Sequence, residues 1–537
     1  MAEQGDFNFD AAEAAPPDAP GERGPDALGD DHGPLRSLMD RNFLEYASYV
    51  ICDRAIPALE DGLKPVQRRI LWALKDMDDG RFIKVANVVG HCMQYHPHGD
   101  ASIGEALVAL ANKTYLIEGQ GNFGNVHTGD GAAAPRYIEC RLTDLARERL
   151  FNDELTDCVP TYDGRHQEPL LLPSKLPLLL MLGSEGIAVG MSTRILPHNF
   201  PELIEAQIAI LKKKAFDIYP DFPQGGRMDV SEYERGNGRV RIRARIAKTD
   251  DTHLAITELP FGVTTESLIG SIEDAVRKRR VAIKSINDYT AEKVEIELVL
   301  RPNAKVDRTI KALYAFTNCE VSISPRFIVI RDSRPAEMDT HEALRAVTER
   351  LVDTLTRELK LRRRELQEER HRKTLVQLFI EERLYKRIEE CRTYEAVQKA
   401  VLDGLEPFRE RLERDVTLKD VDMLLGIRIR RISRFDMEKN RKEIDGIVKE
   451  LAQVEKDLSD PRAYSVRYLR ALLRKVKEQY PRRTEITSFE TVERRELTAR
   501  ELELCYDKDA GYFGYQVKGE AMLQCSSYDK IMLVWKD

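Results

Sequence analysis

Two stretches in the second half of the chain carry an apolar residue at every third or fourth position, and this period limits the possible folds most strongly. Such spacing places the apolar side chains on one face of a long helix. The first stripe is Leu344, Val347, Leu351, Leu355 and Leu359; the second is Ile444, Ile447, Leu451, Val454 and Leu458. Two helices that run out and back, with LLGIRIRRISRF between them, indicate an antiparallel coiled-coil arm with a globular knob.

The segment from about 165 to 335 has a texture typical of a mixed α/β domain. In GRVRIRARIAK, residues 238–248, arginine and apolar residues alternate strictly, which predicts one strand with a buried face. KVEIELVL (293–300) repeats this period, and ESLIGSIEDAVRKRR (266–280) between them is expected to be helical. The arginine row of the first strand either faces phosphate or forms a solvated strand face, and the sequence favours neither.

The segment from about 35 to 111 predicts paired short helices. Pro65 suits the first turn of a helix that Gly80 stops, and Asp100 is expected to cap a helix that runs from about Ala101 to Ala111. Short helices joined by a glycine-containing turn suit a helix-turn-helix module, although this signal alone is weak.

Length and composition indicate a protein of several domains. The chain has 537 residues, eight scattered cysteines without a CxxC pair, no apolar run long enough to span a membrane, and no secretory signal. Free thiols in a reducing cytosol are the better interpretation of the cysteines. The acidic segment 1–34, rich in proline, glycine and alanine, is expected to be disordered. Its nine acids and one arginine give this segment a charge of −8, whereas the whole chain has a net charge of −7. The remainder therefore carries +1, which permits a basic groove.

Tyr137 is the first candidate for chemistry. It follows Arg136 directly in GDGAAAPRYIECRL (129–142), after a loop with little side-chain bulk. A phenol ionises only near pH 10, so a nucleophilic tyrosine needs an activating neighbour, and a guanidinium can both steady a phenolate and hold a phosphate oxygen. The second glycine-punctuated loop, QGNFGN at 120–125, lies upstream. The alternative is a core aromatic residue whose hydroxyl is satisfied locally, and spacing alone favours that alternative.

Other polar clusters are less specific. His96 and His98 flank Pro97 without a third metal ligand nearby, so phosphate contact or acid–base support is the favoured role. Lys64, Arg68 and Arg69 form a basic cluster at a helix start, where anions are also favoured by the helix dipole. DMDDG (76–80) is interpreted as a solvated helix end rather than a magnesium site.

Five motifs resemble, in order, those of the A subunits of bacterial type IIA topoisomerases: gyrase A and, more closely, topoisomerase IV A. They are YASYVICDRAIPALEDGLKPVQRRILWAL, YHPHGDAS, EGQGNFGN, AAAPRYIE and GSEGIAVGMSTRILPHN. The resemblance covers about residues 35–490. It implies a multidomain α+β fold with a winged-helix DNA-cleavage domain at 35–164, an α/β tower domain at 165–335, and a long antiparallel coiled coil with a helical exit-gate dimerisation knob at 336–487.

The resemblance also implies roles for single residues. Tyr137 would attack a DNA phosphodiester and become a 5′-phosphotyrosine, and Arg136 would steady the scissile phosphate. Ile187 would wedge between base pairs and bend the DNA. The positions implied around the cleaved strand are Arg54, Lys64, Arg68, His96 and His98.

The implied partners are double-stranded DNA, a second copy bound through the exit gate, and a B subunit in an A2B2 complex. The sequence shows no EGDSA, no PLRGK, no acidic metal triad and no ATP-binding motif. Mg²⁺ and ATP are therefore expected on the B subunit, with no metal site on this chain. The protein is expected in the cytoplasm, associated with the nucleoid and not with a membrane.

Three departures from the family pattern qualify these expectations. Gln67 stands where the family often has histidine. Ala101 follows HPHGD where fluoroquinolone-binding members usually have serine, with Glu105 at the matched acidic position, so weaker drug anchoring is expected. Residues 488–537 are expected to be a short strand-rich remnant of a C-terminal β-pinwheel, without the glutamine-arginine-glycine box that gyrase uses to wrap DNA.

The expected function is thus DNA cleavage and religation within an ATP-dependent type II topoisomerase that relaxes and decatenates DNA. The alternatives are a gyrase A protein without its wrapping domain and a non-catalytic DNA-bridging clamp.

Overall fold

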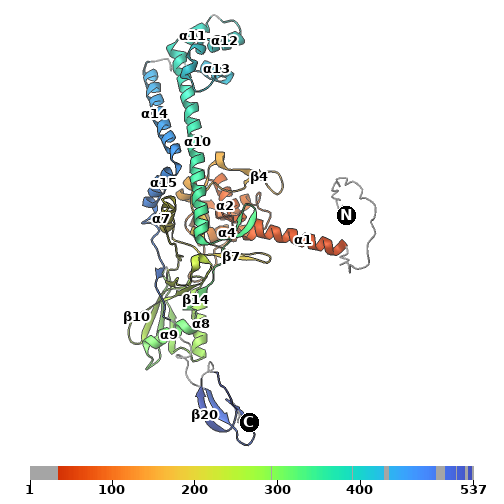
Figure 1. The fold of residues 1–537 in the computed structure, drawn as a ribbon, viewed down its shortest axis with the longest axis vertical. Coiled ribbons are helices and arrows are strands. Elements are labelled where there is room, and N and C mark those ends of the chain that lie inside the picture. The colour runs from red at the N-terminus through yellow and green to blue at the C-terminus, as the bar shows by residue number, and fades with distance from the viewer. Residues whose placement is uncertain are drawn as a thin grey trace. The chain divides into compact units, whose positions relative to one another are not determined.

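The computed structural model describes residues 34–291, 293–389, 391–427, 434–490, 502–515, 517–525 and 530–534. Contacts divide the chain into two units, Met1–Ser48 and Tyr49–Asp537, and the boundary falls within helix α1 (Pro34–Val50). Because the described residues begin at 34, the predicted acidic tail (1–34) lies outside them except for its last residue. All elements after α1 belong to the second unit. Figure 1 shows the ribbon, coloured by residue number. Within the described residues, no helix is long and apolar enough to cross a membrane.

Three helices and a small sheet surround the first part of the main core. The helices are α2 (Pro65–Asp76), α3 (Val85–Cys92) and α4 (Asp100–Ala111); the strands are β1 (Ile83–Lys84), β2 (Ile117–Gln120) and β3 (Glu139–Leu142), in the antiparallel order β1-β3-β2. Pro65 is in the first turn of α2 as predicted, but the helix ends at Asp76, before Gly80. The predicted cap Asp100 is instead the first residue of α4, and Gly99 is the N-cap. Leu71, Ile103 and Leu107 are fully buried between these elements.

Short elements connect this core to the next layer. They are the π-helical turn η1 (Ile51–Ala55), α5 (Asp144–Leu150), η2 (Asp153–Leu155), β4 (Cys158–Pro160), β5 (Gln167–Pro169), α6 (Leu178–Leu182), β6 (Ser184–Ile187), β7 (Ser192–Ile195) and α7 (Phe200–Leu211). Strands β6 and β7 form a hairpin, as do β15 (Ile328–Arg331) and β16 (Arg334–Glu337). Thr193 joins the two hairpins, because its hydroxyl donates to the carbonyl of Ile328 at 2.7 Å.

Two four-stranded sheets follow. One has the order β10 (Arg245–Lys248), β11 (His253–Glu258), β13 (Ile296–Leu300), β12 (Ile283–Asp288); the other has the order β14 (Glu320–Ile323), β9 (Val240–Arg243), β8 (Arg227–Asp229), β17 (Glu485–Ile486). The turn η3 (Glu234–Gly236) precedes β9, and helices α8 (Thr265–Arg277) and α9 (Val306–Phe316) share a core with the first sheet.

The prediction of one continuous strand over 238–248 is wrong. The run breaks at Ala244, whose N–H donates to the carbonyl of Cys319 at 2.8 Å, and its halves β9 and β10 belong to different sheets. Each of the four arginines forms an ion pair within the chain: Arg239–Glu232 (2.6 Å), Arg241–Asp229 (2.5 Å), Arg243–Glu320 (2.5 Å) and Arg245–Glu258 (3.0 Å). The row therefore has carboxylate partners, and its interpretation as a phosphate-facing surface loses its support.

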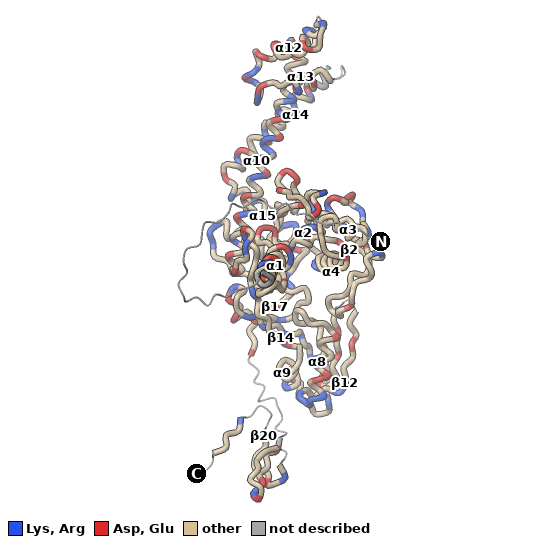
Figure 2. The backbone as a smooth tube through the Cα atoms, turned by 90° about the vertical axis from the view of Figure 1, so that its right-hand side faces the viewer, with Lys and Arg blue, Asp and Glu red and all other residues tan. Residues whose placement is uncertain are grey.

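The predicted apolar stripes pack as two antiparallel helices, α10 (Thr340–Glu381) and α14 (Arg434–Ser459). Leu359 and Leu366 of α10 are buried against Ile447, Leu451 and Val454 of α14. The cross-helix ion pairs run in opposite order along the two helices, as Arg362–Glu450, Lys373–Glu443 and Glu381–Arg441. Figure 2 shows acidic and basic residues interspersed along both helices, as expected for a solvated face.

Further short elements lie at the end of α10, where Figure 1 labels α11 to α13. They are α11 (Leu384–Arg387), α12 (Tyr394–Leu405), η4 (Glu406–Arg411) and α13 (Leu418–Leu425), which form a small core of their own with the end of α10. Part of the predicted knob segment, residues 428–433, lies outside the described residues.

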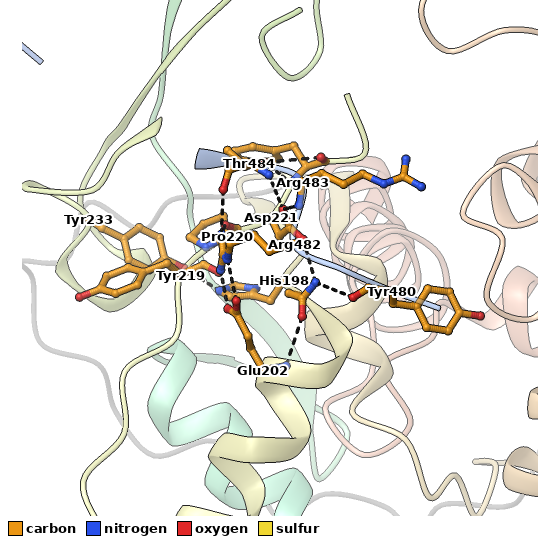
Figure 3. A network of polar contacts seen from close by, with 12 residues as sticks. His198, Glu202, Tyr219, Pro220, Asp221, Tyr233, Tyr480, Arg482, Arg483 and Thr484 are labelled. Carbon is orange, nitrogen blue, oxygen red and sulfur yellow. Dashed lines mark hydrogen bonds and ion pairs between the residues drawn. The ribbon is translucent and has the colours of Figure 1, made fainter. Parts of the chain in front are cut away.

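The chain returns from α14 through α15 (Pro461–Val476) to the start of α7, and a polar network fixes its path there (Figure 3). The guanidinium of Arg482 makes a bidentate ion pair with Glu202 at 2.5 and 2.6 Å. The N–H of Thr484 donates to Asp221 at 2.9 Å, which places β17 beside β8. Near the C-terminus, β18 (Leu502–Tyr506), β19 (Phe513–Gly514) and β20 (Glu520–Cys525) form a sheet of order β19-β18-β20.

Candidate active site

Tyr137 is an exposed phenol on a rigid mount. Its side chain is 63% exposed, so the alternative that it is a core aromatic residue is wrong. The backbone on both sides is fixed to the start of α3, because Val85 donates to the carbonyl of Ile138 at 3.0 Å and Ala86 to that of Pro135 at 3.1 Å. The phenol therefore reaches solvent from a backbone that the core holds in place.

The guanidinium of Arg136 lies over the ring of Tyr137, with its central carbon 4.7 Å from the ring centroid. A cation at this distance is attracted to the aromatic face. A guanidinium can also form paired hydrogen bonds with phosphate oxygens. The pair thus combines a potential nucleophile with a phosphate-binding group.

The two glycine-containing loops predicted near Tyr137 form one unit. Ala133 donates to the carbonyl of Asn122 at 2.9 Å, and Asn125 to that of Asp130 at 3.0 Å. Gly124 permits this approach, because it has a φ of +82° and an added Cβ would lie 2.6 Å from the carbonyl oxygen of Asp130. The bare loop before Tyr137 is therefore anchored on the preceding loop.

His96 and His98 join a connected polar cluster. Their rings meet edge to face with centroids 5.0 Å apart. His98 Nε2 lies 2.7 Å from the hydroxyl of Tyr49, and His96 Nδ1 lies 3.0 Å from Nη1 of Arg69. Arg69 in turn pairs with Glu168, whose Oε1 accepts from Nη2 at 2.9 Å.

Both imidazoles are disposed to be neutral. Burial, reinforced by the nearby charge of Arg69, lowers the pKa of His96 to about 4. Burial and the charge of Arg54 lower the pKa of His98 as well. Neutral imidazoles can accept a proton or share a hydrogen bond, so acid–base support or positioning suits this pair better than a permanent cationic contact.

Arg54, Lys64 and Ile187 are brought together around the β6–β7 hairpin. Arg54 is exposed on η1, and the adjacent residue Ala55 packs so closely against the hairpin that a Cβ on Gly186 would lie 2.1 Å from its carbonyl oxygen. Lys64 Nζ donates to the carbonyl of Glu185 at 2.5 Å, and burial lowers the pKa of this lysine. Ile187, at the end of β6, is 82% exposed.

Arg68 does not join the exposed residues. Its side chain is buried and forms a two-point ion pair with Asp61, at 2.6 Å from Nε and 2.9 Å from Nη2. The structure therefore gives Arg68 a packing partner inside the core, whereas the adjacent Arg69 faces the histidines.

Ala101 and Glu105 lie one helical turn apart on α4 and line the same pocket. This pocket has a volume of about 970 Å³ and is bounded by α3, α4 and the loop before Tyr137. Its other lining residues include Val89, Met93, Gly104 and Ala133, so most of its wall is small or apolar.

No group of three or more histidine, cysteine or acidic residues suited to hold a metal ion occurs among the described residues. The carboxylates of DMDDG have other partners: Asp76 accepts from the hydroxyl of Tyr95 at 2.5 Å, and Asp78 pairs with Arg147 at 2.6 Å. These two carboxylates are therefore already engaged by side chains of the same chain.

Sequence reasoning missed three members of the histidine cluster. Arg69 belongs to the predicted basic cluster without a role of its own, and helical phase could have separated it from the core-facing Arg68. Tyr49 lies 49 positions from His98, which it contacts directly. Glu168 lies 72 positions from His96 and reaches it only through Arg69. No local pattern marks such distant partners.

Known proteins resemble this chain over most of its length. The family model for the A subunit of DNA gyrase/topoisomerase IV matches residues 54–472. The chain is 45% identical over 500 residues to the DNA topoisomerase 4 A subunit of Borreliella burgdorferi, which covers 93% of this chain and 80% of that protein. It is 40% identical over 358 residues to the DNA topoisomerase 4 A subunit of Caulobacter vibrioides, covering 60% of the chain and 47% of that protein. It is 33% identical over 462 residues to the DNA gyrase A subunit of Mycobacterium tuberculosis, covering 79% and 53%.

The family match and these relatives mark the chain as a type II DNA topoisomerase component of the kind that cleaves and religates DNA. The chain belongs to the family of DNA gyrase and topoisomerase IV A subunits. Membership in this family implies DNA as substrate and a partner B subunit, and type II topoisomerases generally use Mg²⁺ and ATP.

Proposed function

We propose that this chain cleaves and religates DNA with Tyr137 as the nucleophile, as part of a topoisomerase IV-like enzyme. The observation that carries the proposal is the exposed phenol under the guanidinium of Arg136. The phenol oxygen attacks phosphorus and loses its proton, the bond from phosphorus to the 3′ oxygen breaks, and the 3′ oxygen leaves as a hydroxyl. Because one phosphodiester replaces another, the reverse reaction reseals the strand.

The other site residues have supporting roles in this proposal. Arg54 and Lys64 hold the DNA backbone near the cleaved strand, neutral His96 and His98 hold or accept a proton, and Ile187 inserts between base pairs as apolar wedges do in other DNA-bending proteins. Arg68 supports the site indirectly, through its buried pair with Asp61.

The proposed assembly is an A2B2 complex. Two copies of this chain bring two tyrosines to opposite strands, residues 35–164 act as the winged-helix domain, and 165–335 act as the tower. Residues 336–487 form the coiled coil and exit gate through which the copies dimerise, and 488–537 contribute to a C-terminal domain. We also propose that the B subunit binds both Mg²⁺ and ATP, as the resemblance to the family implies. The enzyme would act in the cytoplasm on the nucleoid.

The test is trapping of covalent DNA with the chain reconstituted with its B subunit. Tyr137→Phe should abolish the protein–DNA adduct, and Arg136→Lys should lower its yield about 10²–10³-fold, the cost of losing one aligned oxyanion donor. Tyr289→Phe, at another exposed tyrosine, should leave the adduct unchanged. Persistence of the adduct in Tyr137→Phe would overturn the proposal, and its absence in every variant including the parent would favour a non-catalytic clamp.

A gyrase-like function is the second candidate, because gyrase A subunits are also relatives at 33% identity. The higher identity to a topoisomerase IV protein, 45%, favours relaxation and decatenation. Incubation of the complex with relaxed circular DNA and ATP separates the two, because only a gyrase introduces negative supercoils.

A further inference from the structure

The β6–β7 hairpin that presents Ile187 is too short to be rigid by itself. Each strand has four residues, with the register Ser184↔Ile195 to Ile187↔Ser192. An isolated two-stranded hairpin is marginal in water. An apolar wedge must resist the force of stacked bases, so the hairpin needs supports from outside.

The structure shows such supports on both strands. On β7, the hydroxyl of Thr193 reaches β15, and Arg194 exchanges backbone hydrogen bonds with Arg326 at 2.7 and 3.0 Å. On the β6 side, the supports are two amines: Lys64 Nζ on the carbonyl of Glu185 and Lys113 Nζ on the carbonyl of Leu182. The two lysines come from different elements, one before α2 and one after α4.

Lys113 is the unexpected member of this pair. It lies in the turn after α4 and reaches the last residue of α6, just before the hairpin begins. The last carbonyls of a helix have no hydrogen-bond partner within the helix and attract cations, which accounts for an amine at this point. Burial, followed by the nearby charge of Lys64, lowers the pKa of Lys113 to about 8. Burial disfavours the charged form of an amine, so a lysine with no role beyond surface solubility would be expected in solvent instead.

We propose that Lys113 is a positioning residue for Ile187, which fixes the base of the β6–β7 hairpin through the carbonyl of Leu182. This inference rests on the proposed role of Ile187 as a DNA wedge. Lys113 acts on the protein backbone, so removing its amine loosens the hairpin without removing a DNA contact.

The first test needs no DNA. Hydrogen exchange of the amides in residues 184–195 should be about tenfold faster or more in Lys113→Met, the effect expected from losing one charge-assisted hydrogen bond, and Lys113→Arg should restore part of the protection. Lys449→Met, at an exposed lysine of α14, should not alter these amides. Unchanged exchange in Lys113→Met would overturn the inference.

The second test measures DNA bending by energy transfer between dyes at the two ends of a duplex, at saturating reconstituted enzyme. Ile187→Ala should straighten the DNA, Lys113→Met should do so in part, and the double variant should match Ile187→Ala. Fluorescence of the buried Trp72 checks that each variant is folded.

The outcomes separate the two levels of the proposal. If Ile187→Ala leaves the bend intact, the proposed wedge role fails. If Ile187→Ala straightens the DNA but Lys113→Met bends it fully, the inference about Lys113 alone is overturned. A weaker affinity with an unchanged bend at saturation would make Lys113 a DNA contact, which also contradicts the inference.

Discussion

Replacement of Asp61 by asparagine should destabilise the core around α2 by about 3–5 kcal/mol, the cost of breaking a buried ion pair on one side. Asp61 is 1% exposed. One carboxylate oxygen accepts from Arg68 Nε at 2.6 Å and from the N–H of Leu172 at 3.0 Å. The other accepts from Arg68 Nη2 at 2.9 Å and from the N–H of Leu63 at 3.1 Å. In asparagine, an NH₂ group replaces one of the two oxygens, so it would face two of these four donors with another donor. The guanidinium of Arg68 would also lose its counter-charge.

Trp72 provides the assay, because it is buried in the same helix one turn after Arg68. In a background with Trp535→Phe, which removes the only other tryptophan, its fluorescence follows urea unfolding of this core. With an m-value of about 3 kcal/mol/M, the midpoint should fall by about 1–1.7 M. The control Asp79→Asn alters an exposed carboxylate and should change stability by less than about 0.5 kcal/mol. A midpoint for Asp61→Asn within about 0.2 M of its parent would refute the reasoning.

Three further changes test other parts of the site. Acidification from about pH 7.5 to about pH 5 should lower the free energy of unfolding by about 2 kcal/mol through His96, because the pKa of His96 is about 4 in the folded protein and near 6.5 in the unfolded chain. In urea titrations at the two pH values, His96→Gln should lack this part of the loss. Equal losses in the two proteins would contradict the assignment. Ala101→Ser should make fluoroquinolone-stabilised cleavage about fivefold more sensitive to drug by adding a hydrogen-bonding hydroxyl, and unchanged potency would count against it. Gly186→Ala should lower cleavage about tenfold by forcing the hairpin off Ala55, whereas Gly270→Ala, with open space around it, should not; a fully active Gly186→Ala enzyme would disprove the contact.

Local periodicity predicted the long helices well. Leu344, Leu351, Leu355 and Leu359 are all buried as the stripe required, because a helix is specified by contacts three or four residues apart. The prediction for the alternating run 238–248 fails for the complementary reason. A period of two predicts extended backbone, but the sheet to which each half belongs depends on partners such as β11 and β14, which lie elsewhere in the chain.

The candidate site divides in the same way. Motifs selected Tyr137 and Arg136, and the structure shows them stacked and exposed. Motifs could not tell that Arg68 points inward, because that depends on the acceptor Asp61 and on the phase of α2. The contact between Tyr49 and His98 joins two segments that only the folded chain brings together.

The contact between Gly186 and Ala55 links two proposed functions that are far apart in sequence. Arg54 precedes Ala55 on η1, and Ile187 follows Gly186 on β6, so the cation and the apolar wedge sit on two backbones in direct contact. The two backbones already touch at Gly186 and Ala55, so neither can move closer to the other. If Ile187 acts as the proposed wedge, a force that bends DNA over it is transmitted to the segment that carries Arg54. Because Lys64 and Lys113 hold the same hairpin from the side of α2 and α4, the wedge and the phosphate-binding group are expected to engage DNA together rather than one after the other.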